Sequence, residues 1–182
     1  MSDAPNPDDT SRERFRMIVL PHLDAAYRLS RWLTRDASKA QDLTQDAVLR
    51  ALRYFHAFHG EQARAWLLRI VRNTWLDGRR TERTTETLDA AEQVAADTPD
   101  PEQGAIAGDR RQIVARALSS LPQPLREILV LREIEDLSYK QIAEVLDMPI
   151  GTVMSRLARA REKLAETLVA SLGRSEHGLR DL

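Results

Sequence analysis

Residues 137–157 restrict the fold of this chain more than any other segment, because they read as two short helices joined by a tight turn. Ser138 is placed to cap the first helix, and Gln141, three residues later, completes a capping box. Met148 precedes Pro149, which disfavours helix at Met148 and suits the first position of a second helix. This arrangement is typical of a helix-turn-helix that reads DNA.

The second helix of this pair has an apolar face and a polar face. Its apolar residues recur every three or four positions and form a stripe for burial: Val153, Leu157, Ala160, Leu164 and Leu168. Its outward face carries hydroxyls and cations: Thr152, Ser155, Arg156, Arg159 and Lys163. Residues near the start of such a helix reach base edges, and later ones lie nearer the phosphates. An ordinary amphipathic hairpin with a solvated basic face is the alternative, and it does not account for the cap, the turn and this face occurring together.

Helical periodicity continues along the remaining chain, and no stretch shows convincing strand alternation. We therefore predict an all-α fold. Two small helical domains are joined by a flexible acidic linker, and the C-terminal domain contains the helix-turn-helix. The expected boundaries are 1–83 for the first domain, 84–109 for the linker and 110–182 for the second domain.

The helices expected in these domains follow from apolar spacing and from cap and breaker residues. Pro21 is expected to kink or split the first helix, Asp36 to cap the second, and Gly173 to end the last. The predicted spans are 11–33, 36–55 and 62–83 in the first domain, and 110–120, 124–132, 139–146 and 150–172 in the second.

The linker is acidic and the rest of the chain is basic. Residues 84–109 hold seven acidic residues, two prolines and two glycines, but no Lys or Arg. Those seven leave 21 of the chain's 28 acidic residues against all 27 Lys and Arg, a balance of +6. The near-neutral total therefore hides two basic domains suited to phosphate binding. The linker is expected to avoid DNA and to contain at most a helical turn at 88–96, and a plain solvated linker is the alternative.

Composition argues against an enzyme and against a membrane protein. The chain has no cysteine, and its four histidines show no metal-ligand spacing, so we expect no disulfide, metal site or other cofactor. No nucleophile elbow or phosphate-cradling loop is present. The N-terminus does not read as a signal peptide, and no apolar run approaches the ~18 residues of a membrane span. We therefore expect a cytoplasmic protein without direct membrane insertion. A helical nuclease is the alternative from another functional class, and metal-dependent cleavage of DNA would support it.

Along nearly its whole length the chain resembles the extracytoplasmic function (ECF) group of sigma-70 family RNA polymerase sigma factors. Residues 42–51 (DLTQDAVLRA) are similar to the family's core-polymerase-binding helix. Residues 64–73 (RAWLLRIVRN), followed by Asp77 and residues 79–80, resemble the helix that engages the minus-ten element. Residues 121–161 resemble the domain that reads the minus-thirty-five element. The order of these segments makes the resemblance specific.

The resemblance implies a transcription initiation factor without catalytic residues. It implies that the first domain docks on the β′ clamp helices of core RNA polymerase and opens the minus-ten element. It implies that the second domain docks on the β flap and reads the minus-thirty-five element of promoter DNA. A helical anti-sigma factor, often membrane-associated, is expected to hold the protein inactive. A stand-alone helix-turn-helix regulator is the alternative, but it leaves the first domain unexplained.

The site residues that the resemblance implies fall into three sets. The expected core-polymerase-binding residues are Asp42, Gln45, Asp46, Leu49 and Arg53. The expected minus-ten contacts are Phe58, His59, Arg69, Arg72 and Asn73. The expected minus-thirty-five contacts are Thr152, Ser155, Arg156, Arg159 and Lys163.

The residues themselves leave some of these roles open. The acidic face of the first set also reads as an ordinary solvated surface. Trp66 and Trp75 read as core residues, whereas Phe58 and His59 lie in a connection and suit stacking on unpaired bases. Met154 stands where the commonest motif has Lys, so one phosphate contact is not expected at this position.

Overall fold

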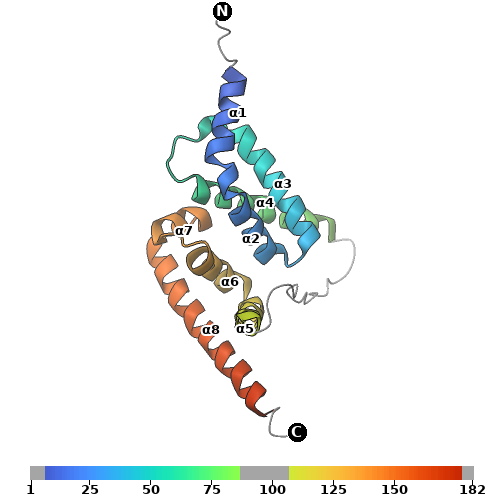
Figure 1. Ribbon diagram of the computed structural model, residues 1–182, viewed down its shortest axis with the longest axis vertical. Coiled ribbons are helices and arrows are strands. Elements are labelled where there is room, and N and C mark those ends of the chain that lie inside the picture. Colours follow the sequence, from blue (N-terminus) through green and yellow to red (C-terminus); the bar gives the residue numbers. More distant parts are fainter. Residues whose placement is uncertain (1–6, 87–106, 178–182) are drawn as a thin grey trace, which may run out of the picture.

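A computed structural model gives the fold of the chain and describes residues 7–86 and 107–177. Within these ranges the backbone is helical, with short turns and no strand, so the all-α prediction is confirmed. Residues 7–86 form a first lobe and residues 107–177 a second lobe, each with four α-helices (Figure 1). None of the described helices is long and apolar enough to cross a membrane.

The first lobe is a packing of α2, α3 and α4, with α1 along one side (Figure 1). Pro21 lies in the 3-10 turn between α1 and α2, so the predicted split of the first helix is confirmed. Asp36 caps α3 by accepting a hydrogen bond from the backbone N–H of Lys39 at 2.8 Å. The elements are α1 Pro7–Ile18, η1 Leu20–His22, α2 Leu23–Thr34, α3 Ala37–Tyr54, η2 Phe55–Ala57 and α4 Ala63–Glu86.

A buried hydroxyl pair fixes how α3 sits on α2. The Thr44 hydroxyl of α3 lies 3.0 Å from Ser30 Oγ of α2 and 2.6 Å from the carbonyl of Ala40. Ser30 Oγ in turn donates to the carbonyl of Ala26 at 2.9 Å. Both hydroxyls are therefore satisfied inside the core, as buried polar groups must be. This packing turns the opposite face of α3 to the outside.

The second lobe contains α5 Ala107–Ser120, α6 Gln123–Leu129, the π turn η3 Val130–Ile134, α7 Tyr139–Leu146 and α8 Ile150–His177. Three boundaries differ from the prediction. The span expected to be one α-helix to residue 132 ends in the π turn. α8 continues past Gly173, because a long helix tolerates the ~1 kcal/mol cost of one internal glycine. Helix also enters both ends of the predicted linker, and the helical turn expected at 88–96 lies outside the described residues.

The predicted helix-turn-helix is confirmed in α7 and the start of α8. Ser138 Oγ accepts from the Gln141 N–H at 3.2 Å, and Gln141 Oε1 accepts from the Ser138 N–H at 2.8 Å, which completes the capping box. Asp147 ends α7 in the left-handed conformation, with φ of 52°. Asp tolerates this conformation better than most non-glycine residues, so the turn forms without a glycine at this position.

The two lobes pack directly against each other. α7 lies on α4, and α6 with its π turn lies on α2 (Figure 1). The buried apolar side chains of both lobes form one contiguous cluster, to which α4 contributes Leu67 and Leu68 and α7 contributes Ile142 and Val145. No pattern in the sequence indicated this arrangement.

Candidate polymerase and nucleic-acid interfaces

One exposed face of α3 carries all five predicted polymerase contacts: Asp42, Gln45, Asp46, Leu49 and Arg53. Leu52 of the same helix follows the helical spacing of the buried apolar residues but is 42% exposed. Leu52 lies one turn from Leu49, which is 47% exposed. The face therefore combines two exposed leucines with a polar rim, which is the general composition of protein-binding surfaces.

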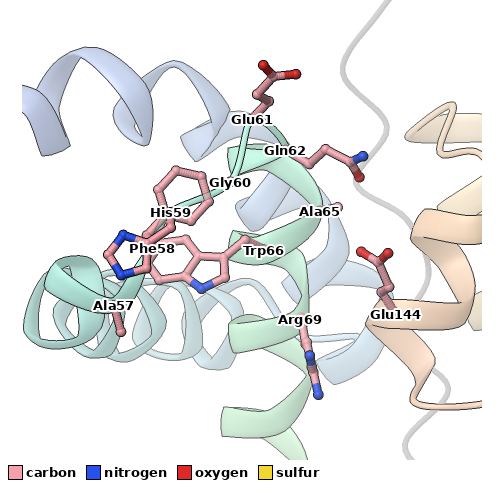
Figure 2. A pocket seen from close by; sticks show the side chains of 10 residues that line it. All are labelled: Ala57, Phe58, His59, Gly60, Glu61, Gln62, Ala65, Trp66, Arg69 and Glu144. Carbon is pink, nitrogen blue, oxygen red and sulfur yellow. The ribbon is translucent and has the colours of Figure 1, made fainter.

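The loop between α3 and α4 opens into a pocket of about 540 Å³ (Figure 2). Trp66 and Arg69 of α4 line one side, and Glu144 approaches from α7 of the second lobe (Figure 2). His59 stands in the loop and is exposed. The lining residues are Ala57, Phe58, His59, Gly60, Glu61, Gln62, Ala65, Trp66, Arg69 and Glu144.

Phe58 lies in this connection, as the sequence indicated, but its side chain does not stand free. Its side chain is buried, with ring centroids 5.9 Å from Phe55 and 4.8 Å from Trp66. The burial of its apolar ring against two other aromatic rings stabilises this position. Trp66 and Trp75 are partly buried and pack on the core, as expected. The pocket thus has a packed aromatic floor beside the exposed His59.

The predicted minus-ten contacts on α4 divide into free and engaged side chains. Arg69 and Asn73 are exposed. Arg72 is not free in this arrangement, because its Nε donates to Glu127 Oε1 of α6 at 2.7 Å. In the packed lobes, therefore, Arg72 does not face outward with Arg69 and Asn73.

Glu127 is buried between the two lobes and interacts with arginines from both. Burial raises the pKa of Glu127 above its ordinary value, whereas the positive charges of Arg72 and Arg156 oppose this rise. Arg72 belongs to the predicted minus-ten set and Arg156 to the minus-thirty-five set. One buried carboxylate therefore interacts electrostatically with a predicted DNA contact of each lobe.

Three of the five residues predicted on the outward face of α8 are exposed, and two are half-buried. Ser155, Arg159 and Lys163 are exposed, and Thr152 is half-buried at the start of the helix. Arg156 is also half-buried, and its positive charge interacts electrostatically with Glu127. The predicted face is therefore present, but Arg156 has a second electrostatic partner inside the molecule.

A second buried carboxylate lies at the end of the π turn and was not predicted. Glu135 is fully buried and accepts from Arg28 Nε at 2.8 Å, from Arg28 Nη2 at 3.0 Å and from Arg64 Nη2. Arg28 comes from α2 and Arg64 from the start of α4. These residues are separated from Glu135 by 107 and 71 positions in the sequence, so no local pattern indicated the cluster.

His22 lies in the turn before α2, and its titration makes the stability of this region depend on pH. Burial lowers the pKa of His22 from its ordinary 6.5, and the positive charge of Arg64 lowers it further. The unfolded chain therefore binds a proton at a higher pH than the folded chain. We expect the contribution of His22 to the free energy of unfolding to be complete above pH 6.5 and to decrease below it, down to the lowered pKa.

Urea unfolding above and below this window measures the effect in the wild type and in His22→Gln, whose side chain does not titrate. Glu127 has a raised pKa and contributes with the opposite sign, but it does so in both proteins. The difference between the two pH profiles therefore isolates His22. Identical profiles would show that His22 is not a source of the pH dependence.

Two family models match the chain in the order of its lobes: Sigma-70 region 2 at residues 18–85 and Sigma-70, region 4 at residues 111–164. The chain is 34% identical to the RNA polymerase sigma-H factor of Pseudomonas aeruginosa, over 86% of this chain and 87% of that protein. It is 37% identical to the ECF RNA polymerase sigma-E factor of Escherichia coli K12, over 68% of this chain and 70% of that protein. The chain belongs to the ECF group of the sigma-70 family.

A solved structure of another sigma factor has a similar fold. The sigma factor RpoE of Bartonella quintana, crystallised with the anti-sigma factor NepR, has a TM-score of 0.71 and 30% sequence identity to this chain. The similarity covers 86% of this chain and 97% of that one. The family is one of transcription initiation factors and not of enzymes, as the composition predicted.

Proposed function

We propose that this sigma factor binds core RNA polymerase and directs it to promoters through a minus-ten and a minus-thirty-five element. The observation that supports this most is the presence of sigma region 2 and region 4 in one chain, each with its own set of candidate contacts. The exposed face of α3 would bind the polymerase β′ clamp helices, and the second lobe would bind the β flap. Because core polymerase is in the cytoplasm, the protein would act there.

The pocket at the start of α4 suits a base that has left the duplex. Its aromatic floor is built from Phe58 and Trp66, with His59 and Arg69 at its edge. Flipping a base costs a few kcal/mol, and stacking on an aromatic ring returns roughly 1–3 kcal/mol. The two terms nearly balance, so strand opening also needs the contacts that polymerase supplies.

The start of α8 suits the duplex of the upstream element. Thr152, Ser155, Arg156 and Arg159 would enter the major groove, where Arg pairs with guanine through two hydrogen bonds. Lys163 lies two turns further along α8 and would contact phosphate without base preference. A single helix-turn-helix buries little surface and binds weakly alone, so this contact would depend on polymerase holding both lobes on one promoter.

We also propose that an anti-sigma factor regulates this protein. RpoE of Bartonella quintana was crystallised with such a partner. A partner that covers the α3 face would compete with core polymerase by mass action. Capture of the sigma factor from unstressed cells should recover this partner. Recovery of free sigma factor alone, with no gain in activity on overexpression, would place control in synthesis or turnover instead.

In vitro transcription with core polymerase on a library of genomic promoters tests the main proposal. We expect specific transcripts that require both the sigma factor and core polymerase. A stand-alone regulator would instead bind one duplex tightly without polymerase and produce no transcript from the library. Metal-dependent cleavage of the DNA would support a nuclease.

A further inference from the structure

The ion pairs that join the two lobes share one arrangement of charge. Among the described residues, every ion pair that joins the lobes takes its arginine from the first lobe and its glutamate from the second. Arg28 and Arg64 meet Glu135, and Arg72 meets Glu127 at 2.7 Å. The side chains of both glutamates are at least 96% buried, whereas Arg28 and Arg64 keep part of their surface in water.

The π turn after α6 is what brings Glu135 into this contact. The Glu135 N–H bonds to the carbonyl of Val130 at 2.9 Å, five residues back, instead of the usual four. π turns of this kind are rare and often lie at functional sites. The turn ends α6 early and places the carboxylate of Glu135 between Arg28 and Arg64.

Ion pairs with a buried carboxylate contribute little net stability to the contact between two lobes. Taking a carboxylate out of water costs several kcal/mol, and apolar residues of similar size often stabilise an interface more. A charged arginine is useful at such a contact if it also binds a second anion at another time. Arginine binds carboxylate and phosphate with the same forked geometry, so one can replace the other.

The arginines on this side also have donors that the glutamates leave unused. Arg64 Nε and Arg31 Nη1 are buried without a hydrogen-bond partner. Arg31 lies one turn from Arg28 on α2. A nucleic-acid backbone carries two free oxygens on every phosphate and would offer acceptors to such donors.

The contact lies beside the pocket that is proposed to hold the minus-ten strand. Arg72 is one turn from Arg69, which lines the pocket, and Arg64 is next to Ala65, which lines it as well. Glu144 of the second lobe lines the same pocket (Figure 2). A strand leaving the pocket would therefore pass close to the arginines that the second lobe now covers.

We propose that Arg28, Arg64 and Arg72 form a phosphate-binding row for the promoter strand, and that Glu127 and Glu135 occupy this row when the lobes are packed together. The second lobe thus acts as an internal substitute for DNA phosphates and blocks the first lobe. This inference rests on the proposed function, because it takes the first lobe as the site of the minus-ten strand. It assigns a DNA contact to Arg28 and Arg64, which the sequence did not indicate.

Two double variants distinguish this proposal from a purely structural contact. Glu127→Gln with Glu135→Gln should separate the lobes and raise the affinity for DNA. Arg28→Gln with Arg64→Gln should also separate the lobes but should lower that affinity below the wild-type value. The opposite directions are the decisive result, because a contact that only closes the molecule would change DNA binding in the same direction in both variants.

DNA binding is measured by fluorescence anisotropy with a labelled single-stranded oligonucleotide of mixed sequence and the full-length protein. We expect about a tenfold change in each direction, which corresponds to about 1.4 kcal/mol. The dependence of log Kd on log salt should become less steep by about 1.4 in the arginine variant, since each lost phosphate contact removes about 0.7. An unchanged salt slope would remove the DNA contact from Arg28 and Arg64.

Matched variants control for net charge. Glu133→Gln with Glu162→Gln makes the same change in charge at exposed sites of the second lobe. Arg12→Gln with Arg16→Gln does so at exposed sites of α1. If these control pairs change affinity as much as the interface pairs, the effect is one of general charge and the proposal is wrong.

The separation of the lobes is followed by energy transfer between two dyes. The chain has no cysteine, so Ser38→Cys on α3 and Ala165→Cys on α8, both at exposed positions, give a cleanly labelled protein. In the labelled protein that keeps Arg28, Arg64, Arg72, Glu127 and Glu135, added oligonucleotide should lower the energy transfer, because DNA displaces the glutamates and the lobes move apart. This measurement decides the question even if a double variant does not fold. DNA binding without any change in transfer would overturn the proposal.

Transcription with core polymerase is measured in parallel on the same proteins. If the wild type supports specific transcription but the variants bind DNA like their controls, only the present inference fails. If no protein supports transcription on any promoter, the proposed function fails.

Discussion

Replacing Asp46 with Arg is expected to weaken binding to core RNA polymerase by about tenfold or more while leaving the fold intact. Asp46 lies in the middle of the exposed face of α3, between Asp42 and Leu49. If this face meets a complementary basic surface, the new charge creates a like-charge contact, which costs several kcal/mol at an interface. At a solvated site the same change costs almost nothing. Titration of labelled sigma factor with core polymerase measures the difference.

The control is Glu13→Arg, which makes the same change of charge at an exposed position of α1. Arg has a better helix propensity than Asp, and Asp46 is solvent-exposed, so the Asp46→Arg variant should unfold in urea near the wild-type midpoint. Equal affinity of both variants for core polymerase would mean that the acidic face of α3 is an ordinary solvated surface. That is the alternative left open by the residues alone.

The sequence predicted well those features that depend on neighbouring residues. The break at Pro21, the cap at Asp36 and the capping box of Ser138 and Gln141 each need only a few positions, and all are present. The exposed face of α3 follows from the same short-range rule, because helical spacing decides which side chains share a face. Leu52 shows the limit of this rule, since an apolar residue in register with a stripe need not have a helix packed over it.

Features that depend on distant residues were not predictable in this way. Phe58 read as a loop residue because its ring partner Trp66 lies on the next helix. Arg72 read as a free DNA contact because no pattern near it in the sequence indicates a pairing with Glu127, 55 residues away. Glu135 adjoins a π turn, and its two arginine partners come from different helices of the other lobe. The contacts of these residues depend on how the two lobes associate. Patterns in a single sequence carry no information about that association.

Replacing Arg156 with Ala is expected to cost about 1–3 kcal/mol of binding to the minus-thirty-five element, as loss of a contact to guanine does. Preference at one base pair should relax at the same time. Arg156 is half-buried and interacts electrostatically with Glu127. Its loss therefore leaves that buried carboxylate with one positive charge fewer, which has a separate cost in stability. The two effects must be distinguished.

The ratio of binding to a promoter duplex and to an unrelated duplex separates them. A loss of folded protein lowers both affinities equally and leaves the ratio unchanged, whereas the loss of a base contact lowers the ratio. Lys163→Gln is the matched control, because Lys163 is exposed two turns further along α8 and is expected to contact only phosphate. It should weaken both duplexes alike and reduce the salt slope by about 0.9. Holoenzyme carrying Arg156→Ala with an unchanged ratio would remove this residue from base recognition and leave Thr152, Ser155 and Arg159 as the readers of the upstream element.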